Sequence, residues 1–413
     1  MDDTSPSIRQ GDEARTRQKY LGNRGLIAFL ALLSAFVPLS TDLYLPAMPV
    51  MTRHFAVPAY QTNLTLILFF VFYSLATLVW GPLSDKYGRR PILLVGLSVY
   101  TVAGALCAVA PNIYLLMLFR ILQAVGAGSA SAVATAIVKD VYEGKKRESI
   151  LALVQSLVII SPAVAPIVGA FLLTLTSWRG TFAAQAVLGV IVVAGSVMFR
   201  ETLAQKGSGS VTKTLGRLAV VIKNPVFAWL LVIFSTNSLS TMAFVASSSY
   251  IYQDGFGLSS QTYSYYFAVN AVGMMIGPWF YVRLSSWFER SSIITTCFIL
   301  MVAGGLLVVL LGGLSPWMFA LTLLPATVAA SCSRPPVIYL LLEQQKADTG
   351  SASALMSSSM TVMGTLGMII ISFDWSDLVW AVGLLHMLVG AFVLTAWLVM
   401  KRKTPLDKVE ASD

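Results

Sequence analysis

Two charged side chains stand inside long apolar runs of this sequence, Asp42 in the run 25–50 and Arg120 in the run 113–138. A charge at bilayer depth costs about 2.5 kcal/mol or more, so an acid or base in such a place is first considered functional. Burial disfavours the ionised form of a carboxyl group, whereas a nearby guanidinium favours it. The two groups therefore predict a site that binds and releases a proton, with Asp42 as the carrier and Arg120 as the tuning group.

Asp42 lies about eight residues and Arg120 about seven residues from the same-side ends of their runs, which at 1.5 Å per helical residue is about 10–12 Å. Both charges are therefore expected at a similar depth, although counting does not say whether they are neighbours. Two plainer interpretations stay open. The pair could be purely structural, or the long Arg120 side chain could extend to the nearer interface.

The composition indicates what must position these charges. Of the 413 residues, 56% are hydrophobic and 11% are charged, whereas a soluble domain has about 25% charged residues. Apolar runs of about 20 residues recur, each long enough to cross a hydrocarbon core of about 30 Å as a helix. We predict an all-α polytopic membrane protein with 12 transmembrane helices in two six-helix bundles. The expected spans are 25–50, 60–82, 91–110, 113–138, 149–174, 179–199, 226–249, 262–282, 291–313, 316–340, 350–373 and 378–400.

A polar stretch divides these spans into two equal sets, an arrangement typical of transporters built from repeats. Gly81-Pro82 at the end of the second span is echoed by Gly277-Pro278 at the end of the eighth. The predicted parts are a cytoplasmic N-terminal tail 1–24, an N-terminal bundle 25–200, a cytoplasmic linker 201–225 containing Lys206–Ser210, a C-terminal bundle 226–400 and a cytoplasmic tail 401–413.

Basic residues gather in the loops on one side of the predicted membrane, which marks that side as cytoplasmic. An even number of spans then places both termini there, and these loops account for the net charge of +9 without a nucleic-acid partner. The cytoplasmic set is Arg9, Arg15, Arg17, Lys19, Arg24, Lys86, Arg89, Arg90, Lys145, Lys146, Arg147, Arg283, Arg290, Lys346, Lys401, Arg402 and Lys403, against Arg53 and Arg179 opposite.

Known centres of enzymatic chemistry have no counterpart in the sequence. Cys107, Cys297 and Cys332 are far apart and lie in or beside apolar runs, which predicts helix packing rather than disulfides or a metal site. His386 is expected to be a packing residue, and hydrolase and metalloprotease motifs are missing. We therefore expect no enzyme, no catalytic residue, no metal and no cofactor.

The loop after the second span runs from Gly81 through Asp85, Gly88, Arg89 and Arg90 to Pro91. It must reverse direction within about seven residues, which needs a permissive glycine and a proline that opens the next helix. This loop resembles the conserved loop of the major facilitator superfamily. The resemblance implies the major facilitator fold and a gating role for Gly81, Asp85, Gly88, Arg89 and Arg90, while ordinary charge anchoring is the plainer alternative.

Further segments of the first half resemble the same family. Residues 120–128 match its arginine and glutamine motif, except that Ala124 replaces a glycine. Residues 161–170 resemble its antiporter motif, with Pro162, Pro166 and Gly169 kept, which implies gating residues in an exporter; a packing kink is the alternative. Residues 40–49 resemble the first span of Bcr/CflA-type drug exporters. Lys139-Asp140-Val141-Tyr142, at the end of the fourth span, resembles the same subgroup, which adds Asp140 to the gating set.

The resemblance implies a central cavity lined by polar side chains within the spans, for which we select Tyr44, Gln123, Asn237 and Asn270. The expected function is proton-coupled export of small drug-like molecules by a monomer in the lipid bilayer of the bacterial inner membrane. A proton-coupled transporter of a sugar, siderophore or amino acid is the main alternative. A receptor or scaffold with a transporter fold is disfavoured, because no tail is long enough for a signalling domain, and a membrane-embedded enzyme comes last.

Overall fold

The computed structural model describes residue 18 and residues 20–203, 211–345 and 349–403. The expectations for the basic tail residues up to Lys19, for Lys206–Ser210, for Lys346 and for the tail from residue 404 lie outside the described residues. The chain forms two compact units, Met1–Gly216 and Arg217–Asp413.

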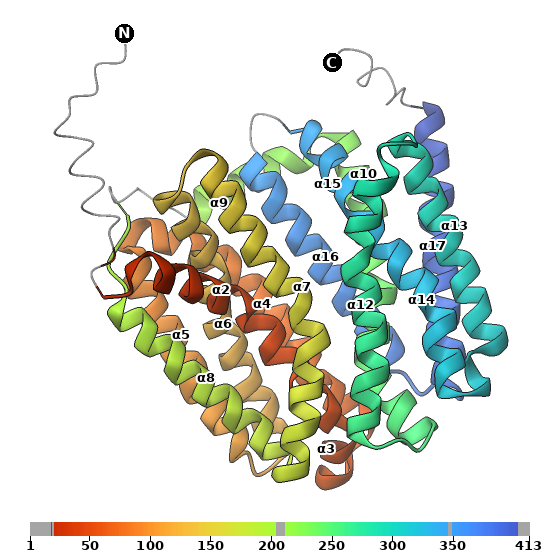
Figure 1. Ribbon diagram of the computed structural model, residues 1–413, viewed down its shortest axis with the longest axis horizontal. Helices are drawn as coiled ribbons and strands as arrows, with labels where there is room; N and C mark the ends of the chain where they lie inside the picture. Colours follow the sequence, from red (N-terminus) through yellow and green to blue (C-terminus); the bar gives the residue numbers. More distant parts are fainter. Residues whose placement is uncertain (1–17, 19, 204–210, 346–348, 404–413) are drawn as a thin grey trace. The chain divides into compact units, whose positions relative to one another are not determined.

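The first unit is a bundle of long helices (Figure 1). Its elements are α2 (Gly22–Asp42), the 3-10 turn η1 (Leu45–Ala47), α3 (Met48–Phe55), α4 (Ala59–Tyr87), α5 (Arg89–Ala108), α6 (Ile113–Val141), α7 (Gly144–Leu175) and α8 (Trp178–Met198). A further helix, α9 (Val211–Ile222), spans the boundary between the units.

The second unit is also a helical bundle. Its elements are α10 (Pro225–Ser235), α11 (Asn237–Tyr250), the π-helical turn η2 (Ile251–Gly255), α12 (Ser260–Leu284), α13 (Arg290–Leu311), η3 (Gly312–Leu314), α14 (Pro316–Cys332), α15 (Arg334–Glu343), α16 (Thr349–Ile371) and α17 (Leu378–Lys403).

All twelve expected spans fall on helices. Eleven described helical segments are long and apolar enough to cross a membrane. The remaining span, expected at 262–282, is the helix α12, which is less apolar because its first half carries serine, glutamine, tyrosine and asparagine side chains. Polar residues in a spanning helix are expected to face the bundle rather than lipid, and Ser264 and Asn270 are indeed fully buried.

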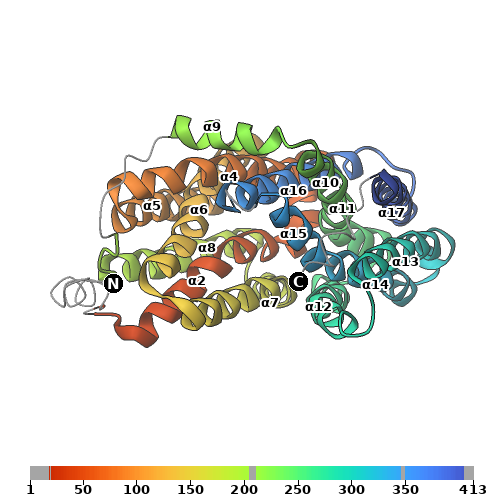
Figure 2. The ribbon, with the colours of Figure 1, turned by 90° about the horizontal axis from the view of Figure 1, so that it is seen from above.

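Helix neighbours repeat between the two units. In the first, α2 packs on α7, α6 packs on α4 and α5, and α5 packs on α8 (Figures 1 and 2); the corresponding pairs in the second are α11 with α16, α14 with α12 and α13, and α13 with α17. Two glycines occupy equivalent places. A Cβ on Gly169 of α7 would lie 1.8 Å from the Leu43 carbonyl oxygen, and one on Gly367 of α16 would lie 1.9 Å from that of Leu239. The repeat is therefore much clearer in the packing than in the sequence.

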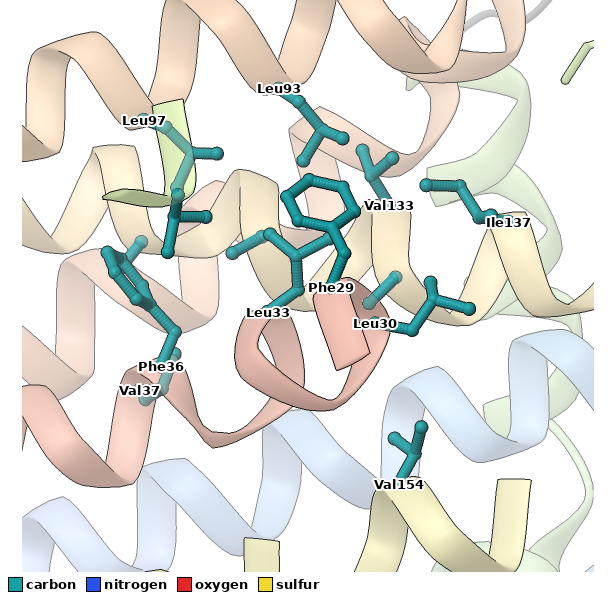
Figure 3. Close-up of a cluster of buried hydrophobic side chains, with 14 of the residues drawn as sticks. Phe29, Leu30, Leu33, Phe36, Val37, Leu93, Leu97, Val133, Ile137 and Val154 are labelled. Atoms are coloured by element: carbon teal, nitrogen blue, oxygen red, sulfur yellow. The ribbon is translucent and has the colours of Figure 1, made fainter. Parts of the chain in front are cut away.

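The core of the first unit is built on one face of α2. Phe29 points toward Leu93 of α5 and Val133 of α6, Phe36 lies beside Leu97 of α5, and the cluster, which includes Leu33, is almost fully buried (Figure 3). These α2 residues recur every three or four positions, which places them on one side of the helix. The face of α2 that packs against α5 and α6 is thereby fixed.

The first span is not one continuous helix, as the run 25–50 suggested. It extends over Gly22–Phe55, but α2 ends at Asp42. The reason is Pro46, which has no N–H to donate to the Asp42 carbonyl four residues earlier. The 3-10 turn that follows is closed by the Ala47 N–H, which donates to the Tyr44 oxygen at 2.8 Å. Asp42 is thus the last residue of a helix that stops inside the span.

The cysteines are free and buried. Cys297 and Cys332 are far apart in the sequence but join one buried cluster between α13 and α14. Within the described ranges, no group of His, Cys, Asp or Glu side chains is placed to hold a metal ion.

Candidate functional site

Arg120 is completely buried on α6 and is held by uncharged groups. Its Nη1 donates to Gln123 Oε1 at 2.6 Å and to the Ser40 carbonyl at 3.4 Å, and its Nε donates to the Thr65 carbonyl at 3.5 Å. Its Nη2 has no hydrogen-bond partner. The Gln123 amide in turn donates to Gln185 Oε1 at 2.9 Å, so a chain of hydrogen bonds runs from α6 to α8.

Three aromatic rings surround the guanidinium. Its carbon lies 4.2 Å from the Phe69 ring centre, 4.5 Å from that of Tyr44 and 5.7 Å from that of Phe182. A desolvated cation over a ring face gains about 2 kcal/mol, which offsets part of the cost of burying the charge. Arg120 does not extend to the interface, and two predicted cavity residues, Tyr44 and Gln123, are its direct neighbours.

Asp42 is also buried, with 7% of its surface exposed. Its carboxylate accepts a hydrogen bond from the Thr41 hydroxyl at 3.1 Å. Within the described part of the chain, no ion pair or hydrogen bond joins Asp42 to Arg120, so the two charges, although expected at a similar depth, are not in direct contact.

The rotation of α2 explains why the pair does not form. Ser40 directs its hydroxyl toward Tyr100 of α5, at 2.5 Å from the phenol oxygen. Two residues further on, a helix has turned by about 200°, so the Asp42 side chain leaves α2 on nearly the opposite side. Arg120 reaches the backbone of α2 at Ser40 but not the carboxylate.

The proline-containing helix α7 meets the chain directly after Asp42. Pro162 and Pro166 lie inside α7. Gly169, on the same helix, lies against the Leu43 carbonyl. A side chain at Gly169 would push α7 away from this point, because a Cβ there would overlap the oxygen. The antiporter-like segment is therefore in contact with the helix end that carries Asp42.

The predicted gating residues form a network at the other end of α4, α5 and α6. Arg89, 5% exposed, donates through Nε to Asp140 Oδ2 at 2.8 Å and through Nη1 to Asp85 and to the Ser84 hydroxyl. Asp140 also accepts from the Thr202 hydroxyl at 3.3 Å. Arg90 binds the last carbonyls of α8, with Nη2 at 2.8 Å from the Val197 oxygen.

Glu201 belongs to this network, although it was not among the predicted gating residues. Its two carboxylate oxygens accept the backbone N–H groups of Arg89 and Arg90 at 2.9 and 3.0 Å. These are the first two N–H groups of α5, and Pro91 has none. The Glu201 carboxylate therefore supplies acceptors for the free N–H groups at the start of α5 and places a negative charge at the positive end of the helix dipole. Gly88 makes room for it: its φ is +111°, and a Cβ there would lie 2.6 Å from Glu201 Oε2. Gly81, by contrast, has open space around it.

The two predicted cavity residues of the second unit both bind α14. Asn237 Nδ2 donates to the Ala330 carbonyl at 3.1 Å, and Asn270 Oδ1 accepts from the Thr327 hydroxyl at 3.4 Å. Each amide keeps one unpaired atom, Oδ1 in Asn237 and Nδ2 in Asn270. His386 is buried with Nδ1 at 2.9 Å from the Val382 carbonyl.

The sequence reasoning overlooked a second arginine inside a span. Arg334 is the first residue of α15, within the segment Pro316–Glu343, and lines a small pocket together with Asn237. The signal was present, since an intramembrane charge is functional by default. Arg334 lies inside the expected span 316–340, just before Pro335-Pro336, but it was not selected as a candidate site residue.

Two repeated bundles of spanning helices with buried charges define a multi-pass membrane transporter. The sequence profile of the Major Facilitator Superfamily matches residues 30–368. The chain belongs to this family, whose members move small molecules across membranes and are not enzymes.

Among curated relatives, an uncharacterised transporter of Bacillus subtilis (strain 168) is 26% identical over 83% of this chain and 87% of its own. A chloramphenicol resistance protein of Pseudomonas aeruginosa is 29% identical over 68% of each chain. Multidrug resistance protein D of Escherichia coli (strain K12) is 26% identical over 65% of this chain and 68% of its own.

Solved structures resemble the fold. A peptide transporter superposes with a TM-score of 0.75 at 12% identity, over 95% of this chain and 99% of its own. The xylose transporter XylE of E. coli gives 0.68 at 13% identity, over 91% and 96%. Identities this low establish the major facilitator fold and nothing about the substrate.

Proposed function

We propose that this transporter exports small drug-like molecules across the bacterial inner membrane in exchange for protons, as Bcr/CflA-type exporters do, with Asp42 as the proton carrier. Curated relatives named for chloramphenicol and multidrug resistance support drug export over transport of a metabolite. The short basic loops support an orientation with both termini in the cytoplasm.

The observation that carries the proposal is the isolation of the Asp42 carboxylate. Among the described residues, it is the acid that lies well inside an apolar span, whereas the others in such spans are near an end. With no cation paired to it, protonation breaks no ion pair. Its place at a helix break beside α7 is suited to a group whose access to water changes as the helices move.

Export then follows by competition. Substrate enters from the cytoplasmic side while Asp42 is ionised, and a proton from the outer side displaces it after the transporter switches. Arg120 keeps a permanent positive charge in the same bundle, on another side of α2, and stabilises the cavity wall formed by Tyr44 and Gln123 rather than neutralising Asp42 directly. The network of Asp85, Arg89, Asp140 and Glu201 holds the cytoplasmic ends of α4, α5 and α6 together during the switch.

The test uses the purified protein in liposomes with an acidic lumen. An antiporter drives chloramphenicol or ethidium into the acidic lumen while protons leave, and a symporter requires the opposite gradient. We expect Asp42→Asn to lose gradient-driven accumulation by about tenfold or more, since one interaction with an ionised group is worth about 1.5–3 kcal/mol. The variant should still exchange labelled substrate without a gradient.

A matched control is Asp374→Asn, which removes an exposed acid outside the spans. Undiminished gradient-driven transport by Asp42→Asn would end the proposal for Asp42. Accumulation driven by the opposite gradient would replace antiport by symport, and failure of all resistance-related substrates would favour a metabolite.

A further inference from the structure

Two interrupted helices meet inside the second unit. The segment Pro225–Gly255 is interrupted at Thr236, between α10 and α11, and the segment Pro316–Glu343 at Ser333, between α14 and α15. The Asn237 side chain joins them through its hydrogen bond to the Ala330 carbonyl. Thr236 and Ser333 keep helical backbone angles, so the two interruptions are local breaks in backbone hydrogen bonding. Breaks of this kind in the spanning helices of transporters commonly form ligand sites, because carbonyl groups there are released from the helix.

Proline causes the second interruption. Pro335 and Pro336 have no N–H to donate to the carbonyls of Ser331 and Cys332, so α14 cannot continue and α15 starts at Arg334. At 1.5 Å per residue, Arg334 lies about 14 Å from the Glu343 end of its span, and Asn237 lies about 18 Å from the Pro225 end of its own. Both groups are therefore within the hydrocarbon region rather than at its edge.

Arg334 differs from Arg120 in having no partner. In the part of the chain that the structure describes, its guanidinium makes no hydrogen bond, ion pair or ring contact, whereas Arg120 has three acceptors and three aromatic rings. A cation at this depth without a counter-charge is costly. A bound anion would pair with the guanidinium and offset the free energy of burying its charge.

The pocket beside Arg334 has the polarity to receive such an anion. Half of its lining is polar and half is apolar: the polar residues are Asn237, Ser238, Ser333 and Arg334, and the apolar residues are Phe234, Phe298, Val337 and Met360. It is narrow, with room for a water-sized group, so it accepts the end of a molecule rather than the whole of it. Asn237 is 7% exposed, and its Oδ1 is a buried hydrogen-bond acceptor that has no donor.

We propose that this junction binds the carboxylate of an acidic solute that carries an O–H or N–H group next to its anionic oxygen. The Arg334 guanidinium donates to the carboxylate, and the neighbouring O–H or N–H of the solute donates to Asn237 Oδ1. A planar guanidinium fits a carboxylate with two parallel hydrogen bonds, which a lysine cannot reproduce. The site adds acidic aromatic compounds to the solutes that the transporter recognises.

Three probes of similar size separate the two contacts. Salicylate has a carboxylate with an adjacent hydroxyl, benzoate has the carboxylate alone, and salicylamide has the hydroxyl beside a neutral amide. Binding to the purified full-length protein is measured by calorimetry and by the shift in melting temperature. We expect salicylate to bind best, benzoate several-fold less well, and salicylamide at least tenfold less well.

Substitutions then assign the contacts. Arg334→Gln should weaken salicylate at least tenfold, Arg334→Lys should recover part of that loss, and Arg283→Gln, an exposed arginine near the end of α12, should leave binding unchanged. Asn237→Ala should weaken salicylate toward the affinity of benzoate while leaving benzoate itself unaffected, which also shows that this variant is folded.

Equal salicylate affinity in Arg334→Gln and the unmodified protein would overturn the proposal, as would salicylamide binding as tightly as salicylate. Equal loss of benzoate and salicylate in Asn237→Ala would overturn the role of the amide. The measurement needs neither a proton gradient nor Asp42, so its failure leaves the antiport proposal intact, and the reverse also holds.

Discussion

The two carboxylates that bind Arg89 should differ in their contribution to stability. The Arg89 side chain is 6% exposed, its partner Asp140 is 19% exposed and its partner Asp85 is 52% exposed. Removing one member of a buried pair leaves an uncompensated charge and costs about 3–5 kcal/mol, whereas an exposed pair contributes about 0–1 kcal/mol. Allowing for the partial exposure of Asp140, we expect a loss of about 2–3 kcal/mol for Asp140→Asn and at most about 1 kcal/mol for Asp85→Asn.

These energies translate into melting temperatures. For a bundle of about 200 residues, 1 kcal/mol corresponds to about 2–4 °C, so Asp140→Asn should lower the melting temperature by about 4–12 °C and Asp85→Asn by no more than about 4 °C. The assay is thermal unfolding of the purified protein followed by tryptophan fluorescence. Asp374→Asn serves as the control for loss of an exposed acid.

A double-mutant cycle identifies the partner. In an Arg89→Gln background, Asp140→Asn should have little further effect, because the pair is already broken. The reasoning is refuted if Asp85→Asn destabilises as much as Asp140→Asn, or if the effect of Asp140→Asn persists without Arg89. The family resemblance alone would have favoured Asp85, which lies within the conserved loop.

Other predictions concern glycine packing and the enclosed arginine. Gly169→Ala, whose Cβ would overlap the α2 backbone, should cost about 1–3 kcal/mol or more in thermal unfolding, whereas Gly81→Ala, with open space around it, should be neutral or slightly stabilising. Gly88→Ala should reduce the free energy of unfolding by about 1–3 kcal/mol through the strained positive φ alone, and further through overlap with Glu201. The melting temperature should fall accordingly, and an unchanged value would contradict the capping geometry. Arg120→Lys should reduce substrate transport while keeping the charge, because an ammonium cannot both cover the rings and reach its acceptors; full activity in the transport assay would show that charge alone is needed.

Local chemistry made several features predictable. The turn after the second span needs a glycine in the left-handed region, and Gly88 has a φ of +111°. The end of α2 at Asp42 follows from Pro46, and the start of α15 follows from Pro335-Pro336, by the same loss of hydrogen bonds. These breaks could have been read from the chain, although the spans were predicted as continuous.

Distant partners could not be predicted in this way. Glu201 caps a helix whose first residue, Arg89, is far away in the sequence, and no local pattern links the two. Asn237 meets Ala330 only because two spans pack together. The contact between Gly169 and Leu43 likewise depends on the approach of α7 to α2.

The sequence by itself determined the membrane class, the positions of the spans and the depth of Asp42 and Arg120, because hydrophobic length and the rise of a helix are local properties. Only the tertiary structure decided which way each charge faces. Successive side chains leave a helix about 100° apart, so a small rotation of the whole helix changes which face a charge lies on. The packing of the bundle selects that rotation. Arg120 thereby lies among aromatic rings, Asp42 lies on another side of α2, and Arg334 lies beside Asn237 at the junction of two broken helices.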